Sequence, residues 1–251
     1  MPFTISHAGF VLPLRPITSP HVLCGLVIGS IVPDFPYFVR EFGVASFAHT
    51  VLGAHCVSLP VGLFVYFLVR LFFGRMADAL PKPHSIFLSS WGLGKIGSKP
   101  NIMAIAVAIL AGALFHNFVD SFTHQSGAAV SIFPVLTKEA ISFGGQPLHA
   151  FRVLQYVGSV LGMVMIAAAY WSGLRGYCRA HEFPIWQDSQ RWLFLTGLII
   201  VTILAAAGLN AEFFPRGLDF YAARVFVFKF LITWLPIAGI AFLVFALCRR
   251  D

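Results

Sequence analysis

Residues 101–122 read NIMAIAVAILAGALFHNFVDSF, an apolar run in which Asp120 is the one charged side chain. A membrane-crossing helix needs about 20 predominantly apolar residues, so this run predicts a transmembrane helix. The whole chain has the same character, because 58% of its 251 residues are hydrophobic and only 11% are charged. Soluble domains carry about 25% charged residues. The composition therefore predicts an integral membrane protein without room for a separate soluble domain.

Further apolar runs lie on both sides of this segment, at residues 53–73, 153–174, 192–211 and 230–248. Upstream, residues 16–33 lack Asp, Glu, Lys and Arg but contain prolines and glycines, and they follow a short apolar piece at 7–14. Prolines discourage helix continuation, so we expect a helical hairpin that turns between Arg15 and Pro20. The predicted fold class is an all-α integral membrane protein with an N-terminal short helical hairpin plus five transmembrane helices.

The predicted organisation is a single membrane domain over residues 1–251. Within it we expect the helical hairpin at 1–40, motif-bearing helices at 41–130 and a C-terminal three-helix part at 150–251. The least apolar stretch, 74–100, contains several prolines, glycines and serines. This composition is typical of a loop.

Charge gives an orientation and excludes one class of partner. The chain has a formal net charge of +7. If the predicted helices cross the membrane back and forth, most Lys and Arg residues, including Arg75, Lys82 and Arg191, lie on one side of it. The positive-inside rule assigns that side to the cytoplasm, so the 34–52 loop faces outward. Nucleic acid is not an expected partner, because the basic residues lie between apolar runs and form no patch with interleaved aromatic residues.

Ionisable side chains in or beside apolar runs are candidate functional groups, since placing them in a membrane is unfavourable. His116 and Asp120 are four residues apart and share one helix face. Imidazole nitrogen and carboxylate oxygen together suit zinc or a similar divalent ion. Alternatively, the two side chains form a hydrogen-bonded polar pair without a metal. The predicted order of membrane crossings brings His7, Asp34 and His49 to the same outward side of the membrane as His116 and Asp120, which favours a shared site.

Short motifs in the first half of the chain carry a family resemblance. They are Ser6-His7, Val32-Pro33-Asp34, Phe47-Ala48-His49-Thr50, and His116-x-x-x-Asp120 followed by Thr123 and Gly127. In this order they resemble the YdjM-like bacterial inner-membrane proteins, a group predicted to be metal-dependent hydrolases. The opening MPFTISH together with GSIVPDFPYF is more similar to an uncharacterised bacterial branch of that group, a domain of unknown function.

The resemblance implies a metal centre with fewer donors than the broader group has. The Asp-x-Asp-His form of the second motif appears here as Asp34-Phe35-Pro36-Tyr37, and His49 lacks a preceding His-Arg-Gly element. One ion is therefore expected, zinc in the first place, with manganese or iron as alternatives. The implied metal ligands are His7, Asp34, His116 and Asp120, with His124 as a candidate additional ligand.

The resemblance also implies catalytic roles and a substrate class. His49 and Asp34 are the candidate catalytic residues, with His49 as the proton carrier, and Thr50 is a candidate substrate-binding residue. A site that opens at the outer membrane interface would favour a lipid or a lipid-linked ester or phosphoester.

Two other functions are compatible with the same residues. His116 and Asp120 could relay protons or bind a cation in a membrane transporter, although no second broken hairpin supports the inverted repeats common in transporters. A non-catalytic membrane scaffold with a structural metal is the other alternative, and a closed, fully protein-ligated shell would favour it.

Overall fold

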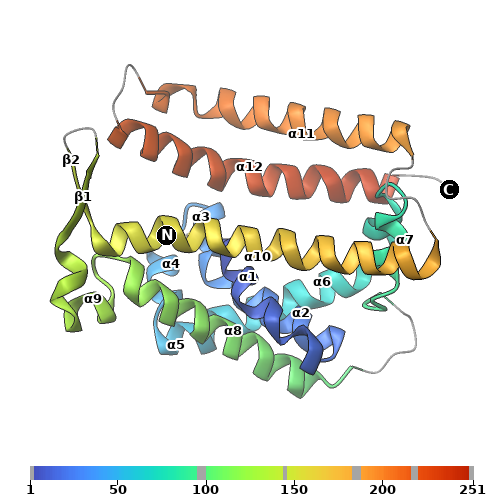
Figure 1. Cartoon of the computed structure of the whole chain (residues 1–251), viewed down its shortest axis with the longest axis horizontal. Helices are drawn as coiled ribbons and strands as arrows, with labels where there is room; N and C mark the ends of the chain where they lie inside the picture. Colours follow the sequence, from blue (N-terminus) through green and yellow to red (C-terminus); the bar gives the residue numbers. More distant parts are fainter. Residues whose placement is uncertain (1–2, 95–99, 144–145, 183–187, 216–219, 249–251) are drawn as a thin grey trace. The chain divides into compact units, whose positions relative to one another are not determined.

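The computed structural model describes residues 3–94, 100–143, 146–182, 188–215 and 220–248. These residues are mainly helical, and the strands among them form one antiparallel hairpin (Figure 1). In chain order the elements are α1 (Ser6–Val11), η1 (Leu12–Ile17), α2 (Pro20–Gly29), η2 (Val32–Asp34), α3 (Phe35–Phe38), α4 (Phe42–Ala48), α5 (Val51–Gly53), η3 (Ala54–Ser58), α6 (Leu59–Asp78), α7 (His84–Ser89), α8 (Ile102–Thr123), α9 (Ala128–Ile132), η4 (Pro134–Thr137), β1 (Glu139–Phe143), β2 (Gln146–His149), α10 (Ala150–His181), α11 (Ser189–Leu209), η5 (Ala211–Phe213) and α12 (Phe220–Cys248). The predicted all-α fold class is confirmed.

Within the described residues, 6 helical segments are long and apolar enough to cross a membrane. They are Pro20–Phe38, Val51–Asp78, Ile102–Thr123, Ala150–His181, Ser189–Leu209 and Phe220–Cys248. The last five overlap the apolar runs that predict transmembrane helices, and the first belongs to the N-terminal hairpin. The chain is thus a multi-pass α-helical membrane protein.

The N-terminal hairpin consists of α1, η1 and α2. The side chain of Ser19 accepts a hydrogen bond from the N–H of Val22 at 3.3 Å and caps α2, whose first residue is Pro20. Proline suits this position because its missing N–H would have no helical partner there. After α2 the chain tightens into η2, because Pro33 has no N–H to continue the helical hydrogen bonds. Asp34, the last residue of η2, therefore lies shortly after the end of α2 and within the span Pro20–Phe38.

Contacts within the chain fall into two compact units. The first comprises Met1–Val69 and Ile96–Gly173, and the second comprises Arg70–Lys95 and Leu174–Asp251. The single membrane domain with three parts stays a prediction.

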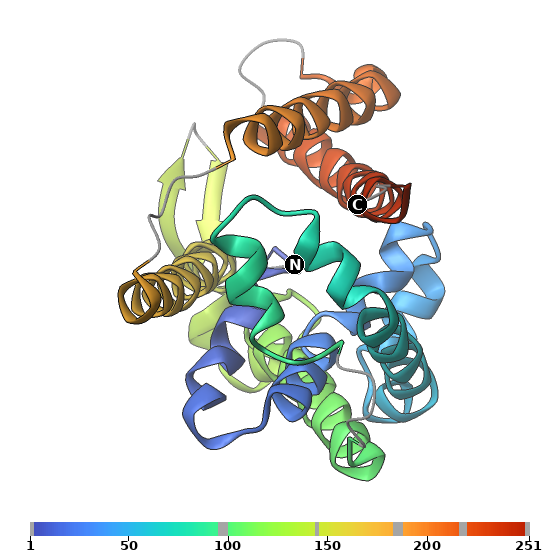
Figure 2. The same ribbon diagram turned by 90° about the vertical axis from the view of Figure 1, so that its right-hand side faces the viewer.

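Glycines allow α2 and α8 to approach closely in the first unit. A Cβ atom at Gly29 would overlap the backbone carbonyl of Ile109, and one at Gly112 would overlap the carbonyl of Leu26. Close helix crossings in membranes are commonly built on such small residues. The crossing packs α2 along α8 (Figure 2), and its buried core residues are Ile28, Val32, Tyr66, Ile105 and Ile109. The end of α2 consequently meets the second half of α8.

The second unit is built around the pair α11 and α12. The rings of Phe194 and Phe245 stack with their centroids 4.0 Å apart. Trp234 Nε1 donates a hydrogen bond to Thr202 Oγ1 at 3.2 Å, which satisfies two polar groups inside an otherwise apolar helix pair. These contacts bind the last two spans to each other.

The loop predicted over 74–100 is wrong in its first part. The helix α6 continues to Asp78, and α7 forms within the expected loop. Pro83 immediately precedes α7, where a proline is compatible with a helix start, and burial of Phe87 anchors the short helix. Residues 95–99 of the predicted loop lie outside the described residues.

Candidate metal centre

Asp34 is held in the turn that ends the N-terminal hairpin. Its side chain is fully buried, and neither carboxylate oxygen has a hydrogen-bond partner among the described residues. A buried carboxylate without compensation is strongly unfavourable. The position therefore calls for a cation close to Asp34.

The second half of α8 supplies two further groups. His116 and Asp120 lie one turn apart, on the same face as Gly112, which packs against α2. Their side chains are buried, and His116 Nε2 is 3.4 Å from Asp120 Oδ2. The spacing of four residues brings the two side chains together, as the helix geometry requires.

His49 follows the last residue of α4, between two membrane spans. Its Nε2 lies 3.3 Å from Asp34 Oδ1 and 3.4 Å from Asp120 Oδ2. The side chain is 19% exposed, whereas those of His116 and Asp34 are 0% exposed. His49 is thus the group of this cluster that solvent can reach most easily.

The metal cluster is defined here by four ligand atoms: Asp34 Oδ1, His49 Nε2, His116 Nε2 and Asp120 Oδ2. One ligand atom from each of these residues lies within 4.8 Å of all the others. The distances from the two histidine nitrogens to the other ligand atoms are 3.2–3.7 Å. In a tetrahedral zinc site with bonds of about 2.0–2.1 Å, neighbouring ligand atoms are roughly 3.3 Å apart. The cluster therefore has the size of a site for one small divalent ion.

Backbone carbonyls determine the orientation of both histidine rings. Nδ1 of His116 is 2.8 Å from the carbonyl oxygen of Ser30, and Nδ1 of His49 is 2.7 Å from that of Ala45. A carbonyl only accepts hydrogen bonds, so both Nδ1 atoms carry protons and each neutral ring presents a lone pair at Nε2. The two Nε2 atoms are 3.2 Å apart. Two facing lone pairs repel each other, so this arrangement requires either a metal ion or an added proton.

In the metal-free chain a proton at His49 fills this role. Burial lowers the pKa of His49, but the nearby carboxylates of Asp120 and Asp34 outweigh burial and raise it to about 10. The ring is then cationic at neutral pH. Since a metal ligand must be deprotonated, binding of an ion at this nitrogen would displace the proton.

His7 lies beside the metal cluster, outside its four ligand atoms. Its Nε2 is 3.4 Å from Oδ1 of Asp120, the oxygen that the cluster does not use. Its ring stacks on His116, with centroids 4.0 Å apart and planes inclined by 25°. A Cβ atom at Gly9 would overlap the carbonyl of Gly162, so α1 packs closely on α10. His7 is thus placed to orient the Asp120 carboxylate.

Sequence comparison assigns a family to the chain. Residues 1–247 match the family described as a domain of unknown function, DUF4184. The chain belongs to this family. No curated protein and no solved structure matches it. The chemistry of the site is therefore argued from its geometry.

The two remaining predicted site residues, His124 and Thr50, are not among the four residues of the metal cluster. His124 Nδ1 is 3.5 Å from Asp120 Oδ2 and 3.0 Å from the Asp120 carbonyl oxygen, and its side chain is 30% exposed. Burial lowers the pKa of His124. The hydroxyl of Thr50 accepts a hydrogen bond from the Gly53 N–H at 2.9 Å and donates one to the Phe47 carbonyl at 2.8 Å. Thr50 thus caps α5, and its substrate-binding role stays a prediction.

Asn117 is a positioning residue that sequence reasoning missed. Its Nδ2 donates to the carbonyl oxygens of Ala48 and Thr50, at 3.2 and 3.4 Å. These two residues flank His49, so the amide ties the His49 segment to α8. An amide beside His116 in an otherwise apolar helix was the available signal.

Proposed function

We propose that the chain is an integral-membrane, metal-dependent hydrolase related to the YdjM-like group. The observation that carries this proposal is the 3.2 Å approach of the His49 and His116 Nε2 atoms, beside two buried carboxylates. A divalent ion relieves the repulsion between the nitrogens and compensates the charge of both carboxylates. No nucleophilic serine or cysteine is needed for such chemistry.

Imidazole nitrogens and carboxylate oxygens are donors that suit zinc first, and manganese or iron as alternatives. A divalent ion in such a set polarises an ester or phosphoester oxygen and acidifies a water molecule. Catalytic zinc sites commonly use three protein ligands and leave one position open. We therefore assign ion binding to the three buried residues, Asp34, His116 and Asp120.

His49 is assigned to proton transfer, because it is the most exposed member of the metal cluster. A histidine can accept a proton from the attacking water and return it to the leaving group. Its Nδ1 contact with Ala45 fixes the ring so that Nε2 points at the reaction site. Asp34, 3.3 Å from this nitrogen, stabilises the charged ring.

The place of the metal cluster in the membrane span favours a lipid substrate. Asp120 is near the end of the span Ile102–Thr123, and a helix rises about 1.5 Å per residue. The carboxylate therefore lies close to the membrane boundary, where lipid ester and phosphoester groups are found. We propose a lipid or lipid-linked ester or phosphoester, reached from the outer leaflet of the bacterial inner membrane.

The test is metal-dependent hydrolysis by the purified full-length chain. The protein is stripped with a chelator, reloaded with zinc, manganese or iron, and assayed on short-chain lipid esters and phosphoesters. His116→Ala and Asp120→Ala should abolish hydrolysis. The matched controls His55→Ala and Glu139→Gln replace exposed residues outside the cluster and should keep it. Activity retained in both cluster variants would refute the assignment.

A structural ion is the second candidate, because four protein donors can close a tetrahedral shell. The variant His49→Ala separates the two functions. A proton carrier predicts an ion that stays bound and hydrolysis that is lost. A structural ion predicts loss of the ion together with a lower melting temperature, and no hydrolysis in the wild-type protein.

A further inference from the structure

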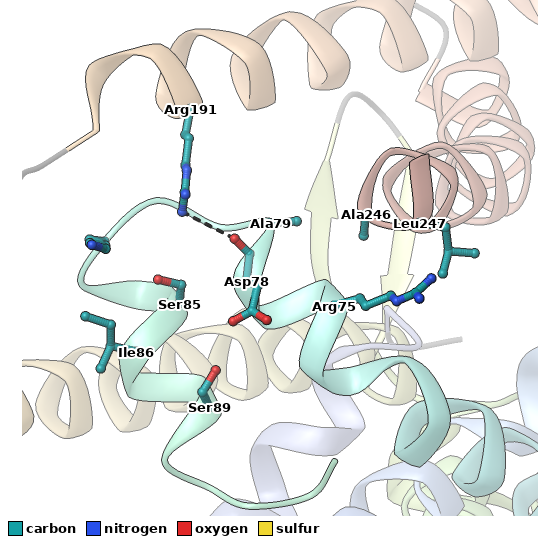
Figure 3. A pocket seen from close by; sticks show the side chains of 10 residues that line it. Arg75, Asp78, Ala79, Ser85, Ile86, Ser89, Arg191, Ala246 and Leu247 are labelled. Atoms are coloured by element: carbon teal, nitrogen blue, oxygen red, sulfur yellow. Dashed lines mark hydrogen bonds between the residues drawn. The ribbon is translucent and has the colours of Figure 1, made fainter. Parts of the chain in front are cut away.

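A cavity lies in the second unit, where three membrane spans have their ends. The helix α6 ends at Asp78, α11 begins at Ser189 and α12 ends at Cys248. The cavity has a volume of about 480 Å³, which is within the rough range of 300–1,000 Å³ for small-molecule sites. Its lining, shown in Figure 3, includes the charged residues Arg75, Asp78, Lys82 and Arg191 and the hydroxyl-bearing residues Ser85 and Ser89.

One wall of this cavity is fixed by Arg191. Its Nη1 donates hydrogen bonds to the carbonyl oxygens of Asp78, at 3.3 Å, and Leu80, at 2.8 Å. The carboxylate of Asp188 accepts a hydrogen bond from the backbone N–H of Lys82 at 3.0 Å. The start of α11 is therefore bonded to the end of α6 and to the loop that follows, so the cavity is preformed.

The charges around the cavity are predominantly positive. Arg75, Lys82 and Arg191 line it, against the single carboxylate of Asp78. Arg191 is engaged in fixing the wall, whereas neither Arg75 nor Lys82 has a side-chain ion pair with any described residue. Two cationic side chains are thus available to a ligand.

Hydroxyl groups and apolar side chains complete the lining. Ser85 and Ser89 are one turn apart on α7, and Ile86, Ala246 and Leu247 provide apolar surface. Cations with hydroxyl donors are the chemistry that binds phosphate oxygens. Basic pockets between transmembrane helices on the cytoplasmic side bind anionic lipid headgroups, and the charge bias of the sequence assigns these span ends to that side.

We propose that this cavity binds a phosphate group, from an anionic lipid headgroup or from a small soluble phosphate. Arg75 and Lys82 contact the phosphate oxygens, and Ser85 and Ser89 donate hydrogen bonds. The apolar residues accept the glycerol and first acyl carbons when the phosphate belongs to a lipid. The inference does not depend on the metal cluster, which shares no residue with the cavity.

The experiment is calorimetric titration of the full-length chain in a non-ionic detergent. The three probes are short-chain phosphatidylglycerol, inorganic phosphate and a short-chain diacylglycerol that lacks phosphate. The double variant Arg75→Gln/Lys82→Gln should weaken phosphate-dependent binding at least about ten-fold, because it removes both cations that contact the phosphate oxygens. Lys82→Arg should keep binding, as should the control Arg179→Gln, an exposed cation that does not line the cavity.

Each outcome decides the proposal. If phosphatidylglycerol binds and inorganic phosphate does not, the site is assigned to a lipid. If inorganic phosphate binds, the site is assigned to a soluble ligand. Three results would overturn the proposal. They are equal affinity for diacylglycerol and phosphatidylglycerol, no binding of either phosphate probe, and unchanged binding in the double variant. The melting temperature of each unliganded variant verifies that the chain is folded.

Discussion

The Nε2 atoms of His49 and His116 face each other at 3.2 Å, while the Nδ1 atom of each ring is bonded to a backbone carbonyl. The backbone thereby directs two lone pairs to one point. Carboxylates from Asp34 and Asp120 surround the same point. Three of the four predictions below, on metal content, Asn117 and pH, share the premise that the cluster binds a metal ion or a proton.

Metal content is the most direct prediction. We expect about one zinc, manganese or iron ion per chain, measured by elemental mass spectrometry on detergent-purified protein. Asp34→Ala and His116→Ala should each lose the ion, because each removes a ligand atom from a different helix. His55→Ala should retain it. An ion that remains in both cluster variants would show that it binds elsewhere.

Asn117→Leu should weaken hydrolysis without removing the ion or any of its ligands. The variant loses the hydrogen bonds to Ala48 and Thr50 that hold the His49 segment. Loss of such supporting contacts typically lowers activity 10–100-fold, so we expect a decrease in the hydrolysis rate of roughly that size, with the ion still bound. The hydrolysis assay and elemental mass spectrometry measure the two quantities, and Ser121→Ala, a half-buried change on the same helix, is the control. Equal hydrolysis rates in all three proteins would contradict a positioning role.

Gly29→Ala and Gly112→Ala should destabilise the first unit. In each case the new methyl group overlaps a carbonyl of the facing helix, and overpacking of this kind costs about 1–3 kcal/mol. Thermal unfolding in detergent should show a lower melting temperature for both. Gly197→Ala is the matched control, because a Cβ there meets nothing within 4 Å. A comparable decrease in the control would attribute the effect to helix glycines in general.

Stability of the metal-free chain should fall as pH rises. The pKa of His49 is raised from 6.5 to about 10, so the folded state binds this proton more tightly than the unfolded state. The stabilisation is complete below pH 6.5 and is lost as the pH rises through about 10. Melting temperatures of chelator-treated protein between these limits test the prediction. His49→Gln should flatten the profile, and a wild-type melting temperature that increases with pH would contradict it.

The fold was predictable because long apolar runs, each sufficient to cross a membrane as a helix, dominate this sequence. The run at 101–122 corresponds to α8, Ile102–Thr123, almost residue for residue. The helix α7 was missed because the prolines before it and its own serines are typical of a loop, whereas burial of Phe87 stabilises it as a helix. Local sequence does not reveal that burial.

Much of the candidate site was predictable for a related reason. Polar residues are so rare here that His7, Asp34, His49, His116 and Asp120 could be grouped from sequence, and they lie together in the structure. Their individual positions could not be predicted. The separation of His7 from the four ligand atoms depends on which Asp120 oxygen it meets, and the Ser30 contact depends on how closely Gly29 and Gly112 allow two helices to approach.

The chain order of the metal cluster has a consequence for biosynthesis. Its four ligand residues all precede the end of α8, and α10 to α12 contribute none of them. Membrane proteins are inserted while they are translated, and N-terminal parts generally fold first. All four ligand residues are therefore translated before the last three spans, so the proposed ion could bind the cluster before the chain is complete.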